Sequence, residues 1–485
     1  MSTEMIEDEI AVKTDLTQGP VAKKLIMFAL PIIAGNIFTQ LYNVTDSVVV
    51  GRFIGSDALA AVTVSFSTMM LFNTLFMGLS MGANVLVAQY RGAKDYSALA
   101  RSVNSTYSLC ILVSAVITVL GIILARPVLI LIGTPDNILS DATLYMILIF
   151  AGTIGNTIYF LSTGLIRGLG DSRWPLYSLI IASVLNLILD VVFVAVFGWG
   201  VAGVAIATAF AQAISAMILV MRFVRGKYGF KLTLSGMKQI DRHLVLQIFR
   251  LGIPSSIQNV AQSLGGVIIQ SFANNFGSDL IAANGIIMRT DGFVIMPLFG
   301  IGMAVTTFVG QNIGAGNVER SKKGTYKALQ LTFGFCLALG FVMYFLGIYI
   351  MRVFTDNQHV LDIGFRGLRF LAFCYIFHGI NLCLGGAVRG AGEAKVPALI
   401  AIISNLFRIP AAYLLAVMPL YRDISAAVSK GIYATRELAR MASVGLDNFM
   451  GLFYSMGISM GCGAVMITLY FIFGKWHTKS IVKRP

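Results

Sequence analysis

Apolar stretches alternate with short polar segments along almost the whole chain. Twelve of these stretches have roughly the 20 apolar residues that an α-helix needs to cross a lipid bilayer. They begin near residues 26, 57, 103, 139, 176, 201, 245, 279, 328, 363, 397 and 447. Only 12% of the 485 residues are charged and the mean hydropathy is +0.82, which excludes an ordinary soluble domain. The pattern predicts an all-α, polytopic membrane protein with twelve transmembrane helices.

Two polar motifs occur twice, and both second copies follow the first at the same offset. The segment VAQYRGA at Val87 returns as VGQNIGA at Val309, and RGLGD at Arg167 returns as RGAGE at Arg389. A repeat of this length in an apolar chain indicates a duplicated bundle of six helices. Membrane proteins of this kind place a ligand site between their two repeats.

The division between the copies falls in the basic stretch near residue 240, which predicts lobes at 1–240 and 241–485. The repeat fails once, where an additional segment precedes the last apolar stretch and forms an outer insertion near 421–446. We expect a solvated loop that lies on the lipid headgroups. A short amphipathic helix on the surface and a gating lid are the alternatives.

The charge distribution predicts which side of the membrane each loop faces. The chain before Leu25 is polar and has no apolar core of a signal peptide, so we expect a cytoplasmic leader. Most of the 36 lysines and arginines then fall on the cytoplasmic side together with both termini. The net charge of +14 is explained by this orientation and by anionic lipid, without nucleic acid. We expect a plasma-membrane protein that acts as a monomer on small molecules.

The five cysteines all fall in apolar stretches and form no CxxC pair. They are therefore predicted to be small core residues, and neither a disulfide nor a cysteine metal site is expected. No cofactor is predicted.

Further segments make the pattern specific. They are Leu30-Pro31, the run LYNVTD at 41–46, Ala60-Ala61, the two QxxGA motifs and the two RGxGxxxxP motifs. Together they resemble the multidrug and toxic compound extrusion (MATE) family over residues 17–420 and 445–474. The resemblance implies an export antiporter with two six-helix lobes, driven by inward flow of H⁺ or Na⁺. The insertion departs from the family pattern.

A polar face runs along the first predicted span. At 100° per residue, Asn36, Gln40 and Asn43 lie on the same side of the helix as Asp46. An ionisable side chain in lipid is costly, so this face must look into the protein or toward water. A structural alternative is that Asp46 only caps the outer end of the helix near Arg52.

A second acidic group lies on the fifth predicted span. Asn186 and Asp190 are four residues apart and share a face, and Thr208 has a comparable depth on the sixth span. Such oxygen donors suit a proton on a desolvated carboxylate or a hard cation such as Na⁺.

The MATE resemblance implies that the aspartates of the LYNxxD and NxxxD segments couple transport to the cation. The residues assigned to cation coupling on this basis are Asp46, Asp190, Asn186, Thr208 and Tyr42. No metal is expected beyond Na⁺ at the two aspartates.

A substrate cleft is expected between the lobes, with an adaptable wall for flat apolar cations. The residues predicted to line it are Asn36, Gln40, Asn43, Tyr159, Met288, Met296 and His378. For His378 we favour a satisfied polar contact over a proton relay.

The remaining polar groups receive structural interpretations. Arg289 and Arg408 are predicted to tie neighbouring spans together. The motif glycines are predicted to form left-handed turns, and the motif arginines to fix the topology. These glycines are Gly92, Gly168, Gly314 and Gly390.

The chain is predicted to be a secondary active antiporter, which exports amphipathic, cationic drugs or toxic compounds in exchange for H⁺ or Na⁺. A flippase for lipid-linked oligosaccharide is the nearest alternative, but only two arginines lie inside the spans to bind a pyrophosphate. An enzyme is not expected because no reactive cluster is present, and a channel would need a selectivity filter.

The acidic residues are not duplicated with the rest of the chain. At the offset of the repeat, the position equivalent to Asp46 is Ile268, and the position equivalent to Asp190 is Ala412. Ion coupling is therefore predicted in the N-terminal lobe.

Overall fold

The computed structural model describes residues 15–430, 432 and 446–482, nearly all of them helical and none in a strand. The helices of the first half are α2 (Val21–Phe53), α3 (Ser56–Gly92), α4 (Tyr96–Leu131), α5 (Asp136–Ala151), α6 (Thr153–Gly168), α7 (Arg173–Asp190) and α8 (Gly200–Val224). After the short α9 (Leu234–Lys238), the second half contains α10 (Arg242–Ala273), α11 (Ser278–Gly314), α12 (Val318–Arg352), α13 (Gln358–Gly390), α14 (Lys395–Ala412), α15 (Met418–Ser429) and α17 (Met450–Phe473).

Eleven of the twelve predicted spans each coincide with one helix, and the span predicted near residue 139 coincides with the pair α5 and α6. Ten helices within the described residues are long and apolar enough to cross a membrane, and α5 and α6 form a further span with a 53° bend. The remaining position holds α10, a helix of 32 residues. The predicted all-α class with twelve membrane helices is confirmed.

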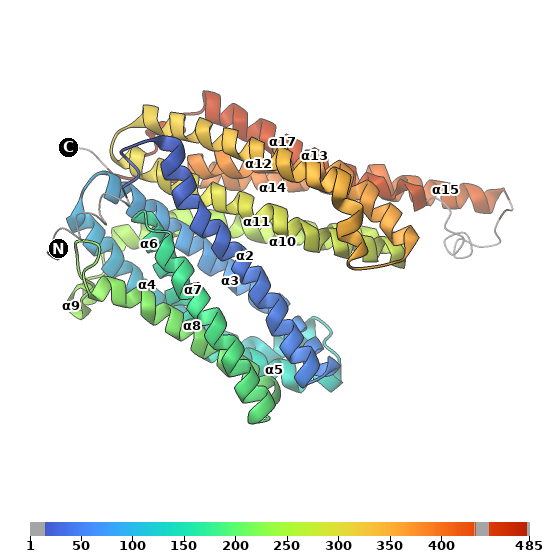
Figure 1. Cartoon of the computed structure of the whole chain (residues 1–485), viewed down its shortest axis with the longest axis horizontal. Helices are drawn as coiled ribbons and strands as arrows, with labels where there is room; N and C mark the ends of the chain where they lie inside the picture. The colour runs from blue at the N-terminus through green and yellow to red at the C-terminus, as the bar shows by residue number, and fades with distance from the viewer. Residues whose placement is uncertain (1–14, 431, 433–445, 483–485) are drawn as a thin grey trace.

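The two halves of the chain meet at one end and diverge toward the other (Figure 1). The start of α2 and the end of α17 lie at the end where the halves meet, which we call the closed end. The first helix of each half also packs on the opposite half, because α2 contacts α11 and α10 contacts α3. The halves are therefore interlocked along their first and second helices.

Small residues allow the close approach of α3 and α10. A Cβ atom at Gly82 would overlap the Ile248 carbonyl oxygen, and one at Gly78 would overlap the Ser256 hydroxyl. Apolar side chains gain little from leaving lipid, so helices in a membrane associate through close packing of this kind.

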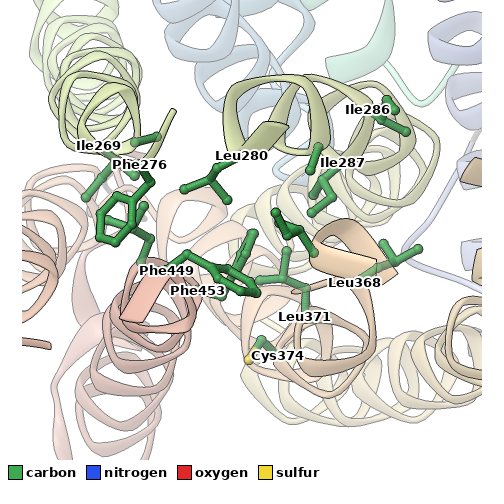
Figure 2. Packing of buried hydrophobic residues seen from close by; sticks show 14 of the residues in the cluster. Ile269, Phe276, Leu280, Ile286, Ile287, Leu368, Leu371, Cys374, Phe449 and Phe453 are labelled. Carbon is green, nitrogen blue, oxygen red and sulfur yellow. The ribbon is translucent and has the colours of Figure 1, made fainter. Parts of the chain in front are cut away.

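A buried apolar cluster fills the second half (Figure 2). Leu280 and Ile287 of α11 point toward Leu371 of α13 and Phe453 of α17. Leu371 is fully buried and Phe453 is 2% exposed. This cluster holds α11, α13 and α17 as one packed unit.

The repeat extends to an uncommon backbone feature. Helix α7 continues into a short π-helical segment, η1 (Val191–Val196), and α14 continues into another, η3 (Tyr413–Val417). We call these two segments the π-turns. The starts of the two π-turns are separated by the same offset as the repeated motifs, so they are equivalent positions of the repeat. Isolated π-turns are rare and are frequent at functional sites. In the first half, the π-turn directly follows Asp190.

Residues 421–429 of the insertion are helical, which corrects the expectation of a loop there and agrees with the alternative of a short amphipathic helix. Helix α15 prolongs α14 beyond the second π-turn, and Leu420, Ile424 and Ala427 lie on its buried face. Their spacing of three and four residues forms one apolar stripe, which explains why the segment stays helical. Residues 431 and 433–445 of the insertion lie outside the described residues.

The motif glycines are not turn residues, which corrects the interpretation from sequence. Each is the last residue of its helix: α3, α6, α11 or α13. The left-handed positions are instead Gly170, Gly316 and Gly392, with φ of 92°, 84° and 103°, and Lys94, with φ of 57°. A Cβ at Gly92 would overlap the Gln311 carbonyl oxygen, and one at Gly314 would overlap that of Gln89. The motif glycines of α3 and α11 are therefore needed for backbone contact between the halves.

We expect Gly82→Ala to destabilise the protein, because its new methyl group would push α3 away from α10. Overpacking of this kind costs about 1–3 kcal/mol. The thermal midpoint of the purified protein would show the loss. Gly285→Ala is the matched control, because that helical glycine has no atom within 4 Å of an added Cβ. Equal midpoints for the two variants would contradict the packing argument.

Candidate functional site

Three of the residues predicted to bind the cation lie on the adjacent helices α7 and α8. Asn186 and Asp190 of α7 are each 1% exposed. The Asn186 Nδ2 atom donates a hydrogen bond of 3.4 Å to the Thr208 Oγ1 atom of α8. Asp190 follows Asn186 by one helical turn on the same face. The structure thus brings Asn186 and Thr208 into contact and places a buried carboxylate next to them.

Of the residues predicted on α2, the structure describes the side chains of Asn36 and Gln40 only. The side chains of Tyr42, Asn43 and Asp46 lie outside the described residues, although their backbone belongs to α2. Helix α2 packs on α7 and on the π-turn η1. Val50, one turn after Asp46, is fully buried in the apolar cluster that contains Val194 of the π-turn.

Helix α2 also contacts the second half through two predicted cleft residues. The Asn36 Nδ2 atom donates to the Met296 carbonyl oxygen of α11 at 3.0 Å. The Gln40 side-chain amide lies against Gly292, where an added Cβ would be 2.9 Å from its Nε2 atom. The polar face of α2 is therefore directed toward α11 at Asn36 and Gln40.

The other predicted cleft residues are dispersed. Tyr159 of α6 is half-buried, with its ring centroid 5.7 Å from that of Phe160. Met288 of α11 is 54% exposed, and His378 of α13 is half-buried. The contacts within the described residues do not join these side chains into one group.

A buried acidic group in the second half was missed from sequence. Asp291 of α11 is 8% exposed, and its Oδ1 atom accepts a hydrogen bond from the hydroxyl of Tyr375 of α13, which is fully buried. Arg408 of α14 interacts electrostatically with Asp291. Arg289 is exposed, with its guanidinium 6.0 Å from the Phe354 ring centroid.

Asp291 received no role from the sequence, because its spacing of two residues from Arg289 prevents the two side chains from pairing on one helix face. The signal in the sequence for a partner of Asp291 was Arg408, because it carries the opposite charge inside a different apolar span. Arg408 occupies the repeat position of Asn186, so both copies carry a polar side chain there, but with different partners.

The motif arginines of α6 and α13 point into the protein, contrary to a purely topological role. Arg389 is 6% exposed, and its Nη1 atom donates to the Gln258 Oε1 atom of α10 at 3.2 Å. Arg167 donates to the Met303 sulfur of α11 at 3.4 Å, across the two halves. These arginines therefore form tertiary contacts within the bundle.

The motif glutamines were also missed as functional candidates. Gln89 Nε2 donates to the Gly390 carbonyl oxygen at 2.9 Å, and Gln311 Nε2 donates to the Gly168 carbonyl oxygen at 2.9 Å. Each bond joins the QxxGA motif of one half to the RGxG motif of the other. The signal in the sequence was that the glutamine is identical in both copies while its neighbours differ.

Comparison with known proteins gives a consistent family. The family model MatE matches residues 31–192 and 254–414, well over half of the chain and once in each half. The chain is 29% identical to the probable multidrug resistance protein YoeA of Bacillus subtilis, over 79% of this chain and 84% of that protein. It is 25% identical to the probable multidrug resistance protein NorM of Thermotoga maritima, over 96% and 95% of the two chains.

Solved structures have the same fold. The crystal structure of MATE in the straight conformation superimposes with a TM-score of 0.83 at 21% identity, covering 95% of this chain and 98% of that one. An outward-facing multidrug resistance MATE family transporter gives a TM-score of 0.82 at 22% identity, covering 94% and 96%.

Tyr375→Phe should destabilise the second half. The substitution removes the hydroxyl that donates to the buried Asp291 carboxylate, and an unsatisfied buried polar group costs about 1–3 kcal/mol. Thermal unfolding in detergent measures the loss. Tyr349→Phe provides the control, because Tyr349 is 62% exposed and its substitution should leave the midpoint unchanged. A midpoint for Tyr375→Phe that matches the control would show that the hydrogen bond contributes nothing.

Proposed function

The chain belongs to the MATE family of multidrug efflux transporters, and we propose that it exports amphipathic, cationic compounds in exchange for H⁺ or Na⁺. The observation that carries this proposal is the buried Asp190 beside the Asn186–Thr208 hydrogen bond. A carboxylate in a membrane span is costly unless a proton, a cation or polar partners accompany it.

Cation coupling is assigned to Asp46 and Asp190, with Asn186, Thr208 and Tyr42 as neighbouring oxygen donors. The packing of α2 on α7 and on the π-turn supports this group, since it brings the two helices that carry the acids together. Loading of the cation changes the conformation only if the two states bind the cation with unequal affinity.

The substrate is proposed to bind between lobes formed by residues 1–240 and 241–485. The Asn36–Met296 hydrogen bond and the contact of Gln40 with Gly292 support this location, because both cross from α2 to α11. The further lining residues of this proposal are Asn43, Tyr159, Met288 and His378. Methionine and aromatic side chains adapt to flat apolar cations of different shape.

The closed end is proposed to lie on the cytoplasmic side of a bacterial plasma membrane, with both chain termini on that side. The excess of lysine and arginine in the loops assigned to this side supports the orientation. In that orientation the described state is closed to the cytoplasm. The transporter is proposed to act as a monomer.

Asp46→Asn and Asp190→Asn should each abolish gradient-driven efflux while expression persists. The amide keeps the shape of the carboxyl group but cannot take up a proton or neutralise Na⁺. Efflux of a fluorescent organic cation from proteoliposomes gives the rate. Asp136→Asn, at an exposed position in the first turn of α5, is the control and should transport normally. Undiminished efflux in both variants would refute the assignment of the acids.

The same proteoliposomes distinguish the coupling ions. Efflux is measured under a pH gradient alone and then under a Na⁺ gradient alone. Transport under one of them identifies the coupling ion, because only the bound ion can supply the driving force. No transport under either gradient would contradict antiport and favour the flippase.

A further inference from the structure

The closed end contains a second polar system that the cation site does not use. It is built on Gln89 of α3 and Gln311 of α11, which are fully buried and 1% exposed. Their Nε2 atoms donate to the Gly390 and Gly168 carbonyl oxygens of the opposite halves. Each glutamine therefore bridges the halves with a hydrogen bond in a place that water does not reach.

The oxygen atom of each glutamine accepts from one end of the chain. The backbone N–H of Leu16 donates to Gln311 Oε1 at 3.0 Å. The backbone N–H of Ile481 donates to Gln89 Oε1 at 2.7 Å. We call the flanking segments the N-terminal strap, residues 15–19, and the C-terminal strap, residues 479–482.

The N-terminal strap precedes α2 in the first half of the chain but is hydrogen-bonded to the second half. The Leu16 carbonyl oxygen accepts from Asn312 Nδ2 at 3.2 Å and from Arg320 Nη2 at 3.4 Å. The same Arg320 atom donates to the Gly19 carbonyl oxygen at 2.8 Å. The Leu16 side chain is 2% exposed, so the strap is packed as well as hydrogen-bonded.

The C-terminal strap follows α17 in the second half of the chain and contacts the first half. Trp476, which is fully buried, stacks on Phe471 of α17 with ring centroids 4.8 Å apart, and this fixes the start of the tail. The Lys479 ammonium then lies 3.8 Å from the Glu393 carboxylate. The Ile481 side chain packs in a cluster that includes Val85 of α3.

We infer that Gln89 and Gln311 are paired positioning residues that hold the closed end shut, and that the two straps brace them. Each strap crosses to the opposite half of the chain. The halves cannot separate at this end unless both glutamine bonds break and the straps leave their seats. The ends of the chain thereby set how readily the closed end opens.

The physical basis is the reciprocal use of one amide group. A buried glutamine must satisfy its NH₂ group and its oxygen together, because an unsatisfied buried polar group is costly. Removing the strap N–H leaves the oxygen without that donor and weakens the closed arrangement, although the NH₂ bond is unchanged. The glutamines and straps therefore act as one unit.

A thiol introduced by Thr307→Cys reports on opening in the full-length protein. Thr307 is 1% exposed, and its hydroxyl hydrogen-bonds to Asn84 of the other half at 3.1 Å. The rate at which N-ethylmaleimide modifies this thiol, read by peptide mass spectrometry, measures transient separation of the halves. The assay needs neither substrate nor coupling ion, so its outcome is independent of the proposed antiport.

Gln89→Ala and Gln311→Ala, each combined with the reporter, should raise the modification rate by at least about fivefold, because each substitution removes both the bond donated by the glutamine Nε2 atom and the bond accepted by its oxygen. Gln330→Ala, at an exposed position of α12, is the matched control and should leave the rate unchanged. Thermal midpoints and transport in the same variants separate opening from general unfolding. Rates for both glutamine variants equal to the control would overturn the inference.

The straps are tested without altering a glutamine. Ile481→Pro removes the N–H that donates to Gln89 together with the Ile481 side chain, while the Ser480 hydroxyl still donates to the same oxygen at 3.4 Å. Val482→Pro leaves both the Ile481 donor and its side chain in place. Ile481→Pro should raise the modification rate several-fold over Val482→Pro, because proline has no backbone donor. Equal rates for the two proline variants would overturn the role of the C-terminal strap. This pair keeps the inference testable if a glutamine variant fails to fold.

Discussion

The structure depends on backbone-to-backbone contact between its two halves, made possible by glycine. Gly92 and Gly314 lie against the carbonyl groups of the opposite motif glutamines, and Gly82 lies against Ile248 of α10. In lipid no large hydrophobic gain rewards helix association, so the closeness of packing and the satisfaction of polar groups decide which surfaces meet. The glutamine bonds form where these glycines bring the chain close enough.

The two copies share their backbone and differ in their charges. The π-turns and the glutamine bonds occur at equivalent positions in both halves. The acids do not: Asp190 precedes the first π-turn, and Ala412 precedes the second. At the position of Asn186 the second half carries Arg408, a cationic side chain that interacts electrostatically with Asp291. A carboxylate that already interacts with a cationic side chain of the protein binds an external cation less readily. This agrees with the proposal that ion coupling lies in the first half.

The sequence predicted the architecture well because apolar length and a repeat at a constant offset are properties of the chain itself. The spans, the duplication and the proximity of Asn186 to Thr208 followed from spacing alone. The motif glycines were misinterpreted, because a glycine required by a neighbouring helix has the same local pattern as one required by a turn. Asp291 and Tyr375 come from different helices, so their contact depends on tertiary packing that helical spacing does not encode. Residues 421–429 were expected in a loop, although their apolar stripe matches a helix.

Helix α2 connects the two polar systems of the molecule. Its 33 residues span about 50 Å at 1.5 Å per residue, from a start beside the N-terminal strap to the packing against α7. Near its start the chain is held to the second half through Leu16, and farther along the helix packs on α7 of the first half. A change in how α2 packs on α7 must therefore also be accommodated on α11 and at the strap. Coupling between distant sites requires such a shared element with two arrangements, and among the described helices α2 is the one that adjoins the strap, the α11 contacts of Asn36 and the helix of Asp190.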